Sequence, residues 1–233
     1  GIILNLNDVD LVNKNGSYDV YATIAGATLN FDNATTFSAA TAGACFYVSN
    51  NTADVSPLTI NSPMTGDLAD YVMAHIAKGK WRMVKRTDAK FEVEGIPHMV
   101  WSEVLYDASL AAGKTLKMFD DVTLSAATTL HNGTLDLNNH TMSVKTTACS
   151  LICSTTSGAY TIKNGKIDAG DIKIDKLISL ATGTGMTLTL EDVDLVNTGK
   201  YDIYVTSTGN TLTFDKKTTF RAATAKACWY VKN

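Results

Sequence analysis

This 233-residue chain has little charge, proline or cysteine, and it lacks a long apolar run. Its 20 basic and 23 acidic side chains are interspersed and give a net charge of −3. The sequence therefore shows neither a basic stripe for nucleic acid nor a polybasic membrane patch. No uninterrupted apolar stretch approaches the roughly 18 residues of a membrane span. We expect no nucleic-acid partner and no membrane span in these residues.

The motifs of several enzyme classes are missing as well. The sequence holds no nucleophile elbow, phosphate loop, zinc-binding helix motif or dinucleotide fingerprint. We therefore predict no catalytic residues and no cofactor.

The first residues of the chain lack the basic start and the small-residue cleavage site of a signal peptide.

What the sequence does contain is a long internal repeat. The stretch from Gly1 to Asn50 returns from Gly185 to Asn233, so that LNDVDLVNKNGSYDVYA is answered by LEDVDLVNTGKYDIYV. Roughly 30 of about 49 aligned positions are identical, with one residue of slippage near Lys14. A surface fibre gains reach with each copy of a module, whereas a catalytic domain gains little. The repeat therefore favours a structural or adhesive role.

The composition favours short strands on an extracellular protein. Apolar residues make up 45% of the chain, which is enough for a sizeable core. The residues between them are rich in Thr, Ser, Asn, Asp and Gly, as in strands joined by turns. Such a surface suits the outside of a cell, so we expect an extracellular or cell-surface location.

The four cysteines are expected to be free. Cys45 and Cys228 occupy the same position in the two repeat copies, so they would lie a full module apart and beyond the reach of a disulfide. The segments ACFYV and ACWYV are similar to ACSLIC. This similarity predicts that Cys45, Cys149 and Cys228 face a narrow core. Cys149 and Cys153 have no second pair nearby, as a zinc site would require.

From Gly113 onward the sequence divides into similar segments of roughly 24 to 26 residues. Each begins with alternating apolar residues and continues through a Gly-, Asn- or Thr-rich turn to another short strand. This length matches one turn of a parallel β-solenoid, in which equivalent strands stack about 4.8 Å apart. We predict an all-β solenoid over residues 113–233. Its predicted core positions are Leu135, Leu137, Ile162, Leu188, Leu190, Leu212 and Phe214.

Residues 1–62 should form the terminal rungs of such a coil, because they copy residues 185–233. Residues 63–112 follow a different pattern. TGDLADYVMAHIAKGK predicts a helix with its N-cap at Thr65 or Asp67 and its end at Gly79.

The rest of this middle region completes a predicted cap. WRMVKRTDAKFEVEG predicts two short strands around a turn at Thr87 to Lys90. A second helix is expected from about Ser102 to Ala112. We interpret residues 63–112 as a helix-hairpin-helix cap or connector between coils.

The run from Met99 to Val144 resembles the start of right-handed β-helix modules in large repetitive surface proteins of anaerobic, often gut-dwelling, bacteria. The segments GKTLKMF, DVTL and TLDLNNHTM carry the likeness, with Asn139 where the family usually has glycine. Asparagine tolerates the left-handed conformation better than most residues, so only the local turn is affected. The resemblance implies a right-handed parallel β-helix of the pectin-lyase-like kind with a small α+β cap.

The wider group of this fold includes pectate lyases and other polysaccharide-cleaving enzymes, and the group also includes phage-tail depolymerases. Fold analogy alone cannot assign such an activity. A groove lined by at least two carboxylates and exposed aromatics would favour a carbohydrate-binding or carbohydrate-cleaving function. A β-sandwich built from the same short strands is the remaining alternative for the fold.

Two sets of acidic residues are the local candidates for such a site. Asp8 and Asp10, mirrored by Asp192 and Asp194, alternate with Val and Leu as in an ordinary half-buried strand. The second set is Asp168, Asp171 and Asp175, which are weak candidates for binding Ca²⁺. Lysines are interleaved with these aspartates, and they favour a solvated loop over a calcium site.

We therefore predict a non-enzymatic structural or adhesive β-helical repeat module of a bacterial surface or extracellular fibre. Its expected partners are further copies of itself, stacked head to tail, or a glycan or protein on a host or cell surface.

Overall fold

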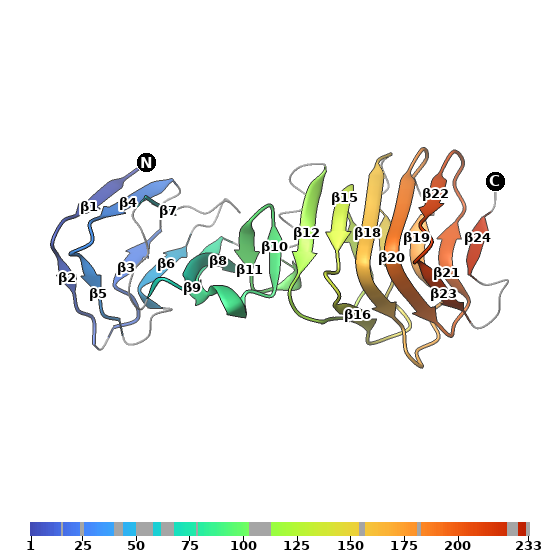
Figure 1. Ribbon diagram of the computed structural model, residues 1–233, viewed down its shortest axis with the longest axis horizontal. Helices are drawn as coiled ribbons and strands as arrows, with labels where there is room; N and C mark the ends of the chain where they lie inside the picture. The colour runs from blue at the N-terminus through green and yellow to red at the C-terminus, as the bar shows by residue number, and fades with distance from the viewer. Residues whose placement is uncertain are drawn as a thin grey trace. The chain divides into compact units, whose positions relative to one another are not determined.

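The computed structural model shows a β-solenoid of about 7 turns (Figure 1). Contacts divide it into two compact units, the first formed by Gly1–Phe91 with Gly95–Glu103 and the second by Glu92–Glu94 with Val104–Asn233. The structure describes residues 1–14, 16–23, 26–39, 44–49, 58–61, 68–77, 79–102, 113–153, 157–180, 183–222 and 228–231. No helix in these ranges is long and apolar enough to cross a membrane.

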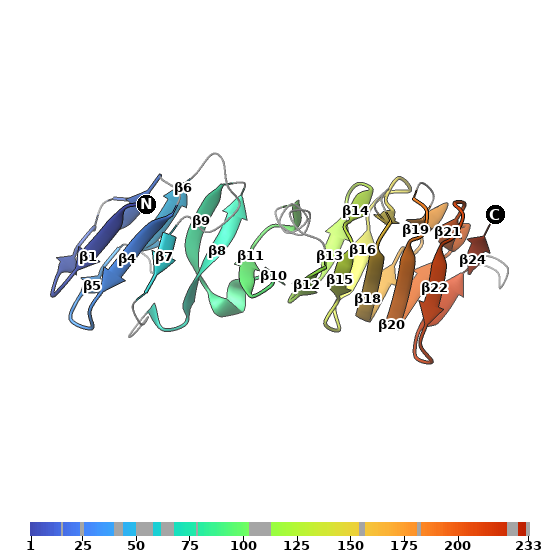
Figure 2. The same cartoon turned by 90° about the horizontal axis from the view of Figure 1, so that it is seen from above.

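The second unit is built from stacked parallel strands, which Figures 1 and 2 show as successive layers. Its strands are β12 (Lys114–Met118), β13 (Val122–Leu124), β14 (Thr128–Leu130), β15 (Gly133–Asp136), β16 (Thr141–Val144), β17 (Leu151–Cys153), β18 (Ala159–Asp168), β19 (Lys176–Leu180), β20 (Thr187–Asn197), β21 (Tyr201–Val205), β22 (Thr211–Phe214), β23 (Thr219–Ala222) and β24 (Trp229–Val231).

Three series of parallel pairs run through these strands. One series joins β12, β15, β18, β20 and β22, and a second joins β13, β16, β18, β20 and β23. The third joins β14, β17, β19, β21 and β24. β18 and β20 are long enough that each strand takes part in both the first and the second series.

Equivalent apolar residues lie directly above one another in this stack. Leu135 pairs with Ile162, and Ile162 pairs with Leu190. Because strands alternate their side chains, every second residue points into the narrow interior. Of the positions predicted as core, Leu135, Leu137, Ile162, Leu188 and Leu190 are buried, and Leu212 and Phe214 in the last rung are half-buried.

The coil turns a corner through residues in the left-handed backbone region. Asn139 has φ 66°, and Asn164 and Asp192 have φ 58° and 55° in the following rungs. The side chain of Asn164 also donates to Asp136 Oδ1 at 3.1 Å. Short polar side chains suit this corner because they tolerate positive φ and bond locally.

The first unit contains parallel strands followed by an antiparallel pair. Its elements are β1 (Ile3–Leu6), β2 (Asp10–Leu11), β3 (Val20–Ala22), β4 (Ala27–Phe31), β5 (Thr36–Phe37), β6 (Phe46–Ser49), β7 (Leu58–Ile60), β8 (Tyr71–Ala77), β9 (Lys80–Lys85), the 3₁₀ turn η3 (Arg86–Asp88) and β11 (Ile96–His98). β10 (Phe91–Val93) lies where the chain passes between the units.

An asparagine ladder supports the sheet of β1, β4 and β7. Asn30 donates to Asn5 Oδ1 at 2.7 Å, and Asn61 donates to Asn30 Oδ1 at 3.1 Å. These strands pair in parallel, whereas β9 pairs antiparallel with both β6 and β8.

The helix predicted up to Gly79 is wrong in its described part. Tyr71–Ala77 forms strand β8, and Gly79, with φ 63°, lies in the tight turn to β9. Thr65 and Asp67 lie outside the described residues, as does most of the second predicted helix, Ser102 to Ala112. The two strands around the predicted turn are present as β9 and β10, with η3 between them. The predicted hairpin is wrong, because β9 pairs with β6 and β8 while β10 lies between β11 and β12.

The repeat in the sequence is a repeat in three dimensions. β1 to β6 correspond in order to the two halves of β20 and to β21, β22, β23 and β24. Leu4 pairs with Leu29 in the first unit as Leu188 pairs with Leu212 in the second. The same sequence therefore builds the same pair of rungs twice.

This duplication allows a matched stability test. Leu188→Ala should lower the free energy of unfolding by about 2 to 5 kcal/mol, because it leaves a cavity at a fully buried site. Its repeat equivalent, Leu4→Ala, should cost less than about 1 kcal/mol, because Leu4 is 42% exposed. Urea denaturation of dilute protein measures both values. Equal losses would contradict the difference in packing between the two positions.

Candidate functional site

A cluster of three stacked tyrosines lies on the outside of the first unit. Tyr21 on β3 and Tyr47 on β6 are in-register partners with ring centroids 5.3 Å apart and planes 4° from parallel. Tyr18 lies 4.4 Å from Tyr47 and 5.8 Å from Tyr21. Asn13 fixes this third tyrosine, because its amide donates to the Tyr18 carbonyl at 2.6 Å.

The second unit repeats the cluster with Tyr201, Tyr204 and Tyr230. Their centroids lie 5.1 to 5.5 Å apart. Asn197, the equivalent of Asn13, donates to the Tyr201 carbonyl at 2.9 Å. Lys176 adds a cation, with Nζ 4.1 Å from the Tyr204 ring centroid. Such cation–π contacts are attractive because the ring face carries partial negative charge.

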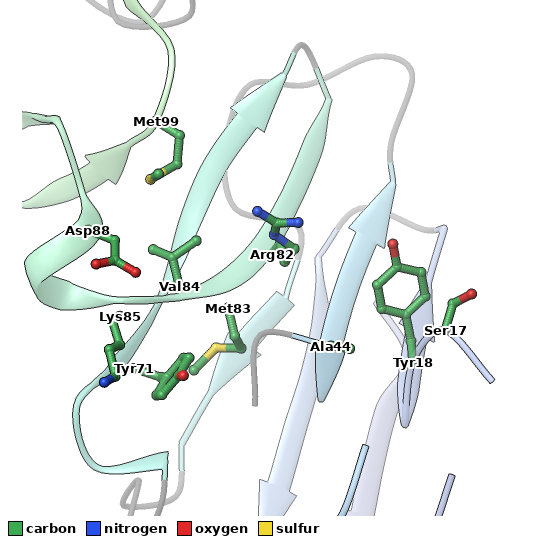
Figure 3. Close-up of a pocket in the computed structure, with 10 residues that line it drawn as sticks. All are labelled: Ser17, Tyr18, Ala44, Tyr71, Arg82, Met83, Val84, Lys85, Asp88 and Met99. Carbon is green, nitrogen blue, oxygen red and sulfur yellow. The ribbon is translucent and has the colours of Figure 1, made fainter. Parts of the chain in front are cut away.

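A pocket of about 370 Å³ opens beside the first tyrosine cluster. Figure 3 shows Ser17 and Tyr18 on one side of it and Lys85, Asp88 and Met99 on the other. The residues that line it are Ser17, Tyr18, Ala44, Tyr71, Arg82, Met83, Val84, Lys85, Asp88 and Met99.

The pocket combines aromatic rings with two cations. Arg82 is the in-register neighbour of Tyr47, so the guanidinium and the tyrosine cluster lie on adjacent strands. Burial, with the neighbouring Tyr18 and Tyr21, raises the pKa of the Tyr47 hydroxyl, which therefore stays protonated at neutral pH. Asp88 is the single carboxylate among the named lining residues, so the paired carboxylates of a polysaccharide-cleaving site are not found there.

The predicted acidic strand residues hold neighbouring rungs together. The hydroxyl of Thr36 donates to Asp10 at 2.5 Å, and that of Thr219 donates to the equivalent Asp194. Asp194 also lies 3.3 Å from Arg221. Asp10 and Asp194 are therefore engaged in contacts between rungs, and Asp192 likewise lies 3.1 Å from Lys217. None of these residues, nor Asp8, is among the described residues that line the 370 Å³ pocket.

The three calcium candidates are not brought together. Asp168 Oδ2 lies 2.5 Å from Lys166 Nζ, and Asp175 lies 3.9 Å from Lys200. Within the described residues, no group of three or more His, Cys, Asp or Glu side chains could hold a metal ion. Asp168 ends strand β18, whereas Asp171 and Asp175 are exposed in the segment that follows it.

All four cysteines are free. Cys45, Cys149 and Cys153 are buried, whereas Cys228 in the last rung is half-buried. Burial raises the pKa of the Cys153 thiol to about 12. This thiol is therefore protonated and unreactive at neutral pH.

An aspartate whose carboxylate oxygens are buried recurs at the same place in both copies, as Asp202 and Asp19, and the sequence did not reveal it. Asp202 on β21 is fully buried, and no hydrogen bond to its carboxylate is found within the described residues. Burial, with a smaller effect of Asp194, raises the pKa of Asp202 to about 7. Burial likewise raises the pKa of Asp19, its repeat equivalent.

No known protein family, curated protein or solved structure matches this chain.

The buried Asp202 predicts an unusual dependence of stability on pH. Its pKa is higher in the folded state than the ordinary 3.8, so the folded state holds the proton more tightly. The contribution of this proton to the free energy of unfolding is therefore complete below pH 4 and is lost as the pH rises through about 7. At 1.36 kcal/mol per pKa unit, the loss amounts to roughly 4 kcal/mol.

Asp202→Asn should remove this loss and make the protein more stable than the parent at pH 8. Urea unfolding across the pH range measures the effect. The matched control is Asp175→Asn, which changes an exposed carboxylate and should keep the parent's pH dependence. Identical pH profiles for the parent and Asp202→Asn would contradict the assignment.

Proposed function

We propose that this chain is a non-enzymatic structural and adhesive module of a bacterial surface or extracellular repeat protein. The observation that carries the proposal is the duplicated pair of rungs, in which both copies keep the same strand register and the same outer tyrosine cluster. A parallel solenoid extends by adding rungs, and each copy adds another outer face. The likeness of the Met99 to Val144 run to right-handed β-helix modules of bacterial surface proteins supports the same role.

The tyrosine clusters supply the adhesive part of this proposal. Lys176 Nζ lies over the Tyr204 ring, so the outer face of the second unit offers both a cation and aromatic rings. Tyrosines of this kind are enriched in recognition surfaces because they bury much area at a small cost in side-chain entropy.

A second candidate function is the binding of an acidic saccharide in the 370 Å³ pocket. The observation that favours it is the combination of Tyr18 and Tyr71 with Arg82 and Lys85 around one cavity. An arginine can bind a sugar carboxylate through two parallel hydrogen bonds, while the tyrosines contact the ring.

One experiment tests the structural role against enzymatic activity. The chain is incubated with neutral and uronate-containing polysaccharides, and both retention and new reducing ends are measured. We expect retention without chain scission, because the lining residues named above lack the carboxylate pair of a cleaving site. Reproducible scission by the purified chain would overturn the non-enzymatic role.

The saccharide site has its own test, in which galacturonate oligomers are titrated calorimetrically. Arg82→Gln should weaken binding at least about tenfold, since it removes a charged hydrogen-bond partner. Lys217→Gln removes an exposed cation from the second unit and should leave the affinity unchanged. An equal effect of both substitutions would indicate general charge attraction in place of a pocket.

A further inference from the structure

The same two tyrosines form the closest pair in both clusters. Tyr18 and Tyr47 have ring centroids 4.4 Å apart, and their repeat equivalents Tyr201 and Tyr230 have centroids 5.1 Å apart. The other pairs of the two clusters lie at 5.3 to 5.8 Å. Tyr18 and Tyr47 are separated by 29 positions in the sequence, as are Tyr201 and Tyr230. The chain therefore brings two phenols of neighbouring rungs together at the same place twice.

The fold fixes both members of each pair. The Asn13 amide donates to the Tyr18 carbonyl at 2.6 Å, and the Asn197 amide donates to the Tyr201 carbonyl at 2.9 Å. The other two tyrosines lie on β6 and β24, which pair in register with β3 and β21. The ring contact therefore follows from the backbone on either side of it.

These rings lie on the outside of the coil, where a reagent in solution can reach them. Tyr47 is half-buried although its strand β6 has neighbours on both sides, β3 and β9. Tyr201 is half-buried between the strands that flank β21, which are β19 and β24. Their partial exposure is therefore a property of the outward face of a complete rung.

The phenol is the feature that packing alone does not explain. Phenylalanine would stack as well as tyrosine, yet all three cluster positions are tyrosine in both copies. The hydroxyl makes each ring oxidisable by one electron. All four cysteines are free, so no disulfide ties one rung to the next. A link between tyrosines is the covalent bond that this arrangement offers in its place.

We propose that Tyr18 with Tyr47, and Tyr201 with Tyr230, are sites of oxidative cross-linking that join neighbouring rungs through a carbon–carbon bond between the two phenol rings. The oxidant is a peroxide acting through a haem peroxidase. Each phenol loses one electron and its hydroxyl proton, and the two phenoxyl radicals couple at ring carbons ortho to oxygen. The hydrogens on these carbons then move to the oxygens and restore two phenols. Overall the pair loses two hydrogen atoms, and hydrogen peroxide is reduced to two molecules of water.

The bond closes a loop of the same length in each unit. Such a link restricts the unfolded chain and leaves the stacked rungs in place, which is how a disulfide is thought to stabilise a protein. This inference goes beyond the proposed structural and adhesive role, because it concerns a covalent change and no ligand.

Peroxidase treatment of the dilute 233-residue chain tests the proposal. We expect a cross-linked monomer with dityrosine fluorescence and two linked peptide pairs, each lighter by two hydrogen atoms than its separate peptides. This monomer should unfold at a higher urea concentration than the untreated chain. The same treatment of the urea-unfolded chain should lower the yield of the two pairs at least about fivefold, since only the fold closes these loops.

Two substitutions in the first unit separate the chemistry of the pair from its position. Tyr47→Phe keeps a stacking ring without a phenol and should lower the dityrosine formed in the first unit at least about fivefold. Asn13→Ala keeps every tyrosine, removes the hydrogen bond to the Tyr18 carbonyl and should lower the Tyr18–Tyr47 link at least about threefold.

Each variant carries its own control. The Tyr201–Tyr230 link of the same molecule should form as in the parent. Tyr71→Phe removes a phenol that lines the pocket beside Lys85, away from the closest pair, and should leave both links unchanged (Figure 3).

The pattern of links decides the outcome. Equal yields from the folded and unfolded chain, links between molecules only, or a full Tyr18–Tyr47 link in Asn13→Ala would overturn the proposal. An oxidised chain without either link would also overturn it. Retention on polysaccharides without cross-linking would remove this inference alone, whereas polysaccharide scission would overturn the non-enzymatic role and leave the cross-linking result readable.

Discussion

The stacking of one rung on the next is the interaction on which the rest of this structure depends. A single rung exposes its apolar residues on both sides, so it gains a core only from its neighbours. The chain displays this dependence directly, because Leu4 and Leu188 occupy equivalent positions and differ in exposure from 42% to 0%. Backbone pairing, side-chain burial and corner geometry all follow the same in-register repeat.

The sequence was sufficient to predict the coil wherever its own period is visible. Successive rungs repeat alternating apolar residues and a polar corner, so positions such as Ile162 and Leu190 could be aligned before their strands were seen. The left-handed conformation at Asn139 fits the sequence as well, because asparagine tolerates it better than most residue types. These features are local or strictly periodic.

The middle region was misread because its pairing is not local. In β8, Ala74 and His75 are both buried, so the strand lacks the alternation that distinguishes a strand from a helix. Gly79 suits a helix end and the tight turn between β8 and β9 equally well, since both need positive φ. The conformation of this region is determined by the antiparallel pairing of β9 with β6, a strand from the repeated rungs. A reading of neighbouring residues contains no information about that partner.

The tyrosine clusters were missed for a related reason, although the repeat contained the signal. Between the copies, inward positions change size, as Phe46 becomes Trp229, while all three outer tyrosines stay identical. Stacking stabilises the outer face by roughly 0.5 to 1.5 kcal/mol per pair, and phenylalanine would stack as well. The retained hydroxyls therefore point to a requirement beyond packing. A polar aromatic face that is kept in both copies while the core residues behind it change fits the adhesive role proposed above.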